Sequence, residues 1–136
     1  MLKLLADFAV ALLLGGMVFF AAVIAPLVFT RLPAEHAGRF IRAVFPFYYL
    51  YVLATAAVGA AALVWSDLAA AMALAAVASV TIWLRQVLMG RINALSDAAQ
   101  AGEEGARGRF DRAHRLSVII NTLQLLAAAW SLARIA

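Results

Sequence analysis

Apolar residues form four long runs along this chain, separated by short segments rich in charged residues, glycine and proline. The runs cover residues 4–29, 47–65, 68–89 and 116–136. Each is close to the roughly 20 residues that a helix needs to cross the hydrocarbon core of a bilayer. The pattern predicts an all-α integral membrane four-helix bundle, folded as one domain. We interpret the first run as a retained span, because it is too long for the apolar part of a secretory signal.

Residues 34–45, between the first two runs, show a second kind of pattern. Apolar and charged side chains there fall on opposite faces of a helix, with the basic residues gathered on the polar face. This is typical of a short amphipathic helix that lies in the membrane interface. Pro46 follows and predicts a bend before the second span.

Small residues and turn residues indicate how the spans pack and where they end. Gly15–Gly16 in the first span and Gly59 in the second would let neighbouring helices approach closely. Ser66–Asp67 predicts a tight turn in which Asp67 caps the third span. Residues 102–108 hold three glycines and predict the flexible connection to the fourth span.

The last run carries a polar stripe. His114, Ser117, Asn121 and Gln124 fall within roughly 80° of one another at the helical 100° per residue, among leucine, isoleucine and valine. Amides at that depth do not face lipid comfortably. The stripe is therefore predicted to face other helices or a cavity.

Two interpretations of this stripe stay open. In one, its side chains make interhelical hydrogen bonds, worth about 0.6–2 kcal/mol per contact, with Tyr48, Tyr49 or Thr55. In the other, the stripe is part of a ligand site. The candidate ligand-binding residues are then Arg31, Tyr48, Arg85, His114, Ser117, Asn121 and Gln124.

Composition and charge support the membrane assignment and add an orientation. Apolar residues make up 67% of the chain and charged residues 13%, too few to cover a water-soluble globule. Nine of the eleven basic residues belong to the two long connections and the helix ends beside them. The positive-inside rule then predicts cytoplasmic connections and external termini, in a bacterial inner membrane. The net charge of +4 is explained by this orientation, so no nucleic acid partner is predicted.

The sequence offers few groups for catalysis or metal binding. His36 and His114 lie on the same predicted side, where they could meet Met89 at a metal or haem. Two histidines without cysteine form a poor ligand set, so we do not favour a metal or haem cofactor. The chain shows no nucleophile–base pair, phosphate loop or paired acids, and no enzyme activity is predicted.

Two blocks of sequence resemble the transmembrane protein 205-like family, a group of four-span proteins of unknown function. The first block, residues 15–49, contains Gly-Gly-Met-Val-Phe-Phe, Ile-Ala-Pro-Leu-Val-Phe-Thr-Arg-Leu-Pro and Phe-Pro-Phe-Tyr-Tyr. The second, residues 91–121, contains Phe-Asp-Arg-Ala-His-Arg-Leu-Ser-Val-Ile-Ile-Asn. The resemblance implies a four-helix membrane bundle. It also implies the signature positions Pro26, Arg31, Pro46, His114, Ser117 and Asn121.

This family is distantly similar to copper-resistance D proteins and to four-span haem-associated oxidases of porphyrin synthesis. The main functional hypothesis is a membrane protein that binds or passes a small molecule or metal complex at its cytoplasmic polar cluster. One alternative is a structural protein, either a homo-oligomer or an accessory subunit of a larger membrane complex. A haem-linked membrane oxidase is the third alternative.

Overall fold

The computed structural model describes residues 1–136 as helices joined by short connections, without strands. The predicted all-α, four-helix class is confirmed. Four continuous rods, Leu2–Arg31, Ala34–Leu63, Leu68–Gln100 and Ala106–Ile135, are each long and apolar enough to cross a membrane. The first and the third rod each contain one π-helical segment, written η. In chain order the elements are α1 (Leu2–Phe19), η1 (Phe20–Ile24), α2 (Ala25–Arg31), α3 (Ala34–Leu63), α4 (Leu68–Trp83), η2 (Leu84–Leu88), α5 (Met89–Gln100) and α6 (Ala106–Ile135).

Helix α3 corrects the expected division between an interfacial helix and the second span. Residues 34–45 are helical, as predicted, but the helix continues through Pro46 to Leu63 without a break. A proline inside a helix removes one backbone hydrogen bond. Packing on the bundle offsets this loss, because Tyr48 and Tyr49 just beyond the proline are buried in the core. Arg85 Nε donates to Pro46 O at 3.3 Å and joins η2 to α3 at the same level.

Segment η1 shows how the first rod accommodates Pro26. Pro26 cannot donate a hydrogen bond to the carbonyl four residues earlier, and its ring crowds that carbonyl. The π-helical turn of η1 lies directly before it. A wider turn at this point relieves the clash, so the rod continues to Arg31 instead of ending at the proline.

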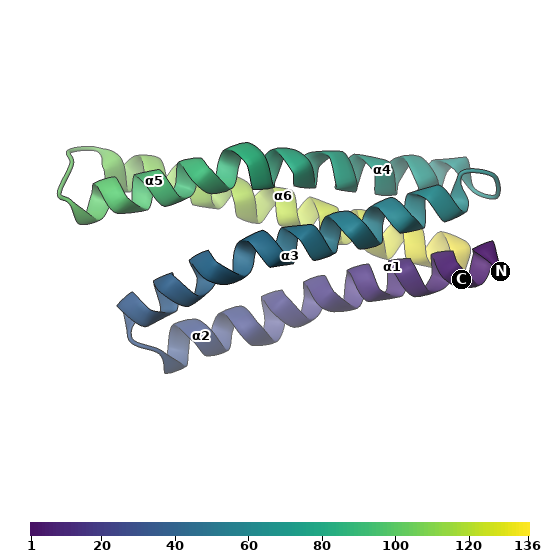
Figure 1. Cartoon of the computed structure of the whole chain (residues 1–136), viewed down its shortest axis with the longest axis horizontal. Helices are drawn as coiled ribbons and strands as arrows, with labels where there is room; N and C mark the ends of the chain where they lie inside the picture. Colours follow the sequence, from purple (N-terminus) through teal and green to yellow (C-terminus); the bar gives the residue numbers. More distant parts are fainter.

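The rods form two antiparallel hairpins whose ends differ (Figure 1). Both chain termini and the turn between α3 and α4 lie at one end, which we call the closed end. The α2–α3 and α5–α6 connections lie at the other, which we call the open end. Nine basic and five acidic residues belong to the open half and two of each to the closed end, so the whole net charge of +4 is at the open end.

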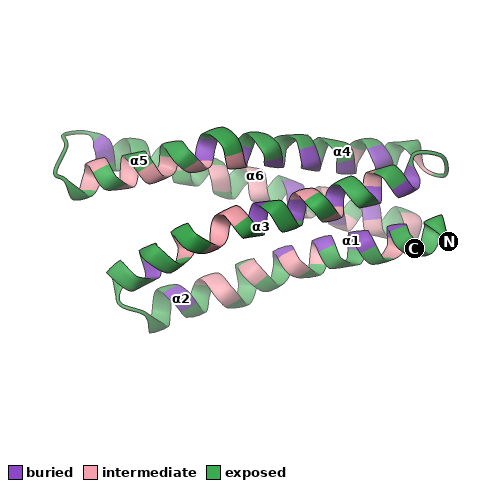
Figure 2. Cartoon of the chain, viewed as in Figure 1, coloured by how far each residue is buried: buried purple, intermediate pink, exposed green.

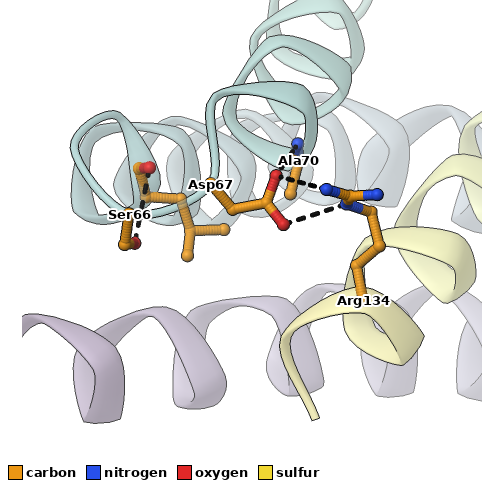
Figure 3. A network of polar contacts seen from close by, with 5 residues as sticks. Ser66, Asp67, Ala70 and Arg134 are labelled. Carbon is orange, nitrogen blue, oxygen red and sulfur yellow. Dashed lines mark hydrogen bonds and ion pairs between the residues drawn. The ribbon is translucent and has the colours of Figure 1, made fainter.

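Polar contacts fasten the closed end. The Asp67 carboxylate caps α4 by accepting from Ala70 N at 3.0 Å, and it also accepts from Arg134 Nε at 2.9 Å (Figure 3). Lys3 Nζ donates to Ile135 O at 3.1 Å and to Asp7 Oδ2 at 3.0 Å. These contacts join α1, α4 and α6 at the closed end, opposite the end that holds the cleft described below.

Small residues bring the helices of the core together. A Cβ atom on Gly16 would lie 2.3 Å from Tyr51 Cε1, so only glycine allows this approach of α1 to α3. At Gly59 the nearest atoms would be Leu74 Cδ1 at 3.0 Å and Val10 Cγ2 at 3.3 Å. The predicted small-residue contacts therefore occur at Gly16 and Gly59, whereas Gly15 faces open space.

Much of the apolar surface remains on the outside of the bundle. Only 26 of 136 residues are buried, and large side chains such as Phe8, Leu12, Phe19 and Leu123 are more than half exposed (Figure 2). Exposed apolar area on this scale marks a surface that is covered by something other than water. Contact with a lipid bilayer explains it along all four rods.

Candidate binding cleft

The two hairpins separate towards the open end (Figure 1). Residues of both hairpins line a cleft there. Its outer part, at the mouth, has a volume of about 340 Å³, and its inner part about 290 Å³. Small-molecule sites commonly measure about 300–1,000 Å³. The two parts adjoin, because both are lined by Phe29, Ile41, Phe45, Tyr49, His114 and Ser117.

The mouth of the cleft is polar, and its charges are paired. Arg42 Nη2 on α3 donates to Asp97 Oδ1 on α5 at 2.8 Å and to Asn93 O at 3.2 Å. We call this contact the Arg42–Asp97 clasp. Arg39 pairs with Glu35 one turn away. The two arginines and two carboxylates that line the mouth therefore neutralise one another.

The inner wall of the cleft is aromatic. Phe45, Tyr48 and Tyr49 share one face of α3 through their i, i+3 and i+4 spacing. The Phe20 ring of η1 stacks on Tyr48 with centroids 4.4 Å apart, and Phe45 lies 5.3 Å from Tyr49. Phe20, Phe45 and Tyr49 line the cleft and Tyr48 packs against them, so these rings form an aromatic wall on the α3 side of the cleft.

The hydroxyl groups of Tyr48 and Tyr49 have different surroundings. Tyr48 Oη donates to Asn121 Oδ1 at 2.9 Å, which joins α3 to α6 behind the cleft. Tyr49 is only 6% exposed, yet its hydroxyl makes no hydrogen bond to the protein. Ser131 Oγ is the single fully enclosed side-chain polar atom without a partner, so the Tyr49 hydroxyl is not fully enclosed, and Tyr49 lines the cleft. The Asn121 amide nitrogen likewise donates to no protein atom.

The polar stripe of α6 divides between two tasks. His114, Ser117 and Asn121 line the cleft. Gln124 lies deeper and is buried, where its Nε2 donates to Thr81 Oγ1 at 2.9 Å and to a backbone carbonyl of α4. The stripe thus faces helices and a cavity, as its spacing predicts. Gln124 belongs to the packing of α6 on α4 rather than to the cleft lining.

The other residues predicted for the site lie around the cleft rather than in it. Arg31 and His36 are exposed near the α2–α3 connection and are not among the lining residues. Arg85 is half-buried and supports Pro46 O from η2. His114 and Met89 both line the outer part, without His36. No group of three or more His, Cys, Asp or Glu side chains is arranged to hold a metal ion.

Sequence reasoning missed several lining residues. The clasp joins positions 55 residues apart, and nothing in a single sequence pairs them. Asn93, Ser96 and Gln100 had a usable signal, because their spacing forms a polar face on a helix that continues past the third apolar run. Phe20 carried no such signal, because an aromatic residue inside an apolar run is as easily explained by contact with lipid or by packing in the core.

Comparison with known proteins gives one match. A family model described as a domain of unknown function (DUF4149) matches residues 8–101. No curated protein and no solved structure matches the chain. The matched segment runs from α1 through α5, so it contains the α3 wall and the α5 side of the cleft and stops before α6.

Proposed function

We propose a binding function for this chain, which belongs to the family of domains of unknown function DUF4149. In this proposal it is an integral membrane protein that binds or passes a small molecule or metal complex at the cleft of the open end. His114, Ser117 and Asn121 of α6 contact the ligand together with Tyr49 and Phe45 of α3. Arg31, Tyr48, Arg85 and Gln124 act on it only through the helices they position.

The observation that carries the proposal is the way the cleft is kept open. Alanine or glycine occupies the places where larger side chains would fill it, at Ala21, Ala25, Ala34 and Gly38. Packed rings hold the opposite wall in place. A cleft of this volume with a rigid apolar wall and a few hydrogen-bonding groups has the usual make-up of a small-molecule site.

We propose further that the protein lies in a bacterial inner membrane with its open end in the cytoplasm. The placement of nine of eleven basic residues towards that end supports this orientation. A relationship to the transmembrane protein 205-like group is part of the same proposal, supported by the two sequence blocks that border the cleft.

Filling the cleft with a side chain tests the binding function. In Ala25→Phe the new ring occupies the inner part, whereas Ala22→Phe places the same ring three residues earlier, outside the lining. Protein purified in a mild non-ionic detergent is examined by native mass spectrometry. We expect a bound small-molecule mass on the wild type and on Ala22→Phe, and its loss from Ala25→Phe.

Two results contradict the proposal. One is wild-type protein that carries no adduct in any mild detergent. The other is an adduct that persists unchanged in Ala25→Phe, which places it on the outer surface. Circular dichroism of both variants confirms that the helical fold is kept, so a lost adduct is not a consequence of unfolding.

A further inference from the structure

The position and polarity of the cleft point to a class of ligand. We infer that it takes a single-chain amphiphile of no net charge, which enters sideways from the bilayer between η1–α2 and α6. This inference rests on the proposed function and names its ligand class and route. Three observations carry it: where the inner part opens, how the charges of the mouth are paired, and which hydrogen-bonding groups are free.

The inner part of the cleft opens towards the side of the bundle. Ala21 and Ala25 of the first rod form one edge, and Val118 and Thr122 of α6 form the other. Ala21, Val118 and Thr122 are exposed, so no further helix covers the gap between these edges. Both edges belong to apolar runs that are long enough to span a membrane. The opening therefore faces acyl chains, and an apolar chain can lie in it without crossing water.

The arginine and carboxylate side chains that line the mouth are paired with one another, so none is free to pair with an ionic head group. Arg42 is held by Asp97, and Arg39 is held by Glu35. An anionic or cationic head would have to displace one partner of these pairs, or remain unpaired beside a low-dielectric wall, and both are costly. A head group without net charge avoids this cost.

Free hydrogen-bonding groups lie where the apolar inner part meets the polar mouth. Tyr49 lines both parts, and its hydroxyl has no protein partner. Asn121 lines the inner part from the opposite helix, and its amide nitrogen donates to no protein atom. A ligand hydroxyl or carbonyl at this level would be bonded from both sides, with its chain in the inner part. Long-chain alcohols, monoacylglycerols and prenylated quinones share this chemistry.

Three photoreactive probes test the inference in nanodiscs of zwitterionic phosphatidylcholine. The probes are sixteen-carbon chains that carry a diazirine and end in an alcohol, a carboxylate or a trimethylammonium group. We expect the alcohol probe to label residues of η1–α2 and residues 117–122, and excess 1-hexadecanol to compete for this labelling. Labelling should fall at least about fivefold in Ala25→Phe and remain unchanged in Ala22→Phe.

A matched pair of tyrosine variants isolates the hydrogen bond. Tyr49→Phe removes a hydroxyl that no protein group uses, so we expect about two- to tenfold weaker binding of the alcohol probe with an unchanged unfolding midpoint. Tyr51→Phe removes a hydroxyl that donates to Leu12 O, outside the cleft lining and away from Asn121. It should lower the unfolding midpoint and leave probe binding within about twofold of the wild type.

The outcomes separate the inference from the proposed function. If the carboxylate or trimethylammonium probe labels the same residues more strongly and responds to Ala25→Phe, the inference of an uncharged ligand is wrong and binding at the cleft stands. All three probes could instead label the outer faces of the rods evenly, to the same extent in Ala25→Phe as in the wild type. In that case the inference of entry from the bilayer is wrong. The adduct on purified protein then decides whether the cleft binds a water-soluble molecule instead.

Discussion

Tyr48 and Tyr49 are neighbours in sequence, and both are buried, but only Tyr48 uses its hydroxyl within the protein. Tyr48→Phe leaves Asn121 without its donor, so we expect the free energy of unfolding to fall by about 0.5–1.5 kcal/mol. Tyr49→Phe should leave it unchanged. Reversible unfolding in mixed micelles, followed by circular dichroism, measures both. Equal losses in the two variants would show that the Tyr49 hydroxyl also has a protein partner.

Gly15 and Gly16 offer a second matched pair at the residue scale. An added Cβ at Gly16 would overlap the Tyr51 ring, whose hydroxyl donates to Leu12 O, so Gly16→Ala should destabilise the fold by about 1–3 kcal/mol. Gly15→Ala meets nothing within 4 Å and should be neutral, or stabilising by up to about 1 kcal/mol through helix propensity. The same unfolding assay compares them. A neutral Gly16→Ala would mean that α1 and α3 are not in close contact.

For single residues, the sequence predicts which side chains are turned away from lipid, but not whether each of them contacts a helix or a cavity. Spacing alone places His114, Asn121 and Gln124 on one protected face. Whether each of them lines a cavity or bonds a helix depends on the rotation and tilt of the neighbouring rods. For Gln124 the outcome depends on Thr81, a residue that a helical pattern leaves indistinguishable from its apolar neighbours.

Among the elements, the turn between α3 and α4 makes the closed end sensitive to acid. The hydrogen bonds from Arg134 hold the pKa of Asp67 below its ordinary value. A carboxylate with a lowered pKa stabilises the fold above its unfolded-state pKa, near 4, and this contribution disappears as the pH falls through the folded-state pKa. Asp67→Asn keeps a capping side chain but loses the ion pair. We expect its melting temperature to lie below that of the wild type at pH 7, and the difference to shrink as the pH falls below about 4.

Thermal scans of both proteins at pH 3–7 in the same detergent check this expectation. A difference that stays constant across the range would assign the effect of Asp67→Asn to the cap rather than to Arg134. Arg134→Gln is the complementary variant, because it keeps the Asp67 cap and removes only the partner.

The Arg42–Asp97 clasp is the only ion pair that joins α3 to α5 across the mouth of the cleft. Both side chains are largely exposed, at 41% and 62%. Exposed pairs of this kind contribute about 0–1 kcal/mol. A double-mutant cycle with Arg42→Gln and Asp97→Asn should therefore give a coupling energy below about 1 kcal/mol. A value above about 2 kcal/mol would mean that the clasp locks the mouth rather than leaving it free to open.

The number and order of the elements follow from the sequence more closely than their continuity does. Four apolar runs correspond to four rods, because burying a span's backbone in lipid requires a helix. Pro46 predicts a bend, yet α3 continues past it, and the first rod likewise continues past Pro26. The sequence shows that a proline removes a hydrogen bond, but it does not show what compensates: the burial of Tyr48 and Tyr49 beside Pro46 and a π-helical turn before Pro26.

For the whole molecule, the two hairpins predict which segments reach the same side of a membrane. The chain has no cysteine, so single cysteines can be introduced and labelled in intact spheroplasts with an impermeant maleimide. We expect Ser66→Cys to be labelled directly. His36→Cys and Glu103→Cys should be labelled only after the membrane is permeabilised. Labelling of all three without permeabilisation, or a different side for positions 36 and 103, would contradict the proposed orientation.

The arrangement that matters most for function exists only at this scale. The cleft depends on two hairpins that are fastened at the closed end and separate at the open end, and no local pattern encodes that separation. The sequence predicts a polar cluster near the basic connections. The structure adds the aromatic wall, the paired charges of the mouth and the opening towards the bilayer.

A side-chain-resolution density map of the purified protein in lipid nanodiscs tests this arrangement most directly. We predict elongated non-protein density that runs from the Tyr49 hydroxyl and the Asn121 amide towards Val118, with α2 and α6 apart. A map in which α2 packs directly on α6 would contradict it. So would a map in which Asn121 and Gln124 point outwards at acyl chains.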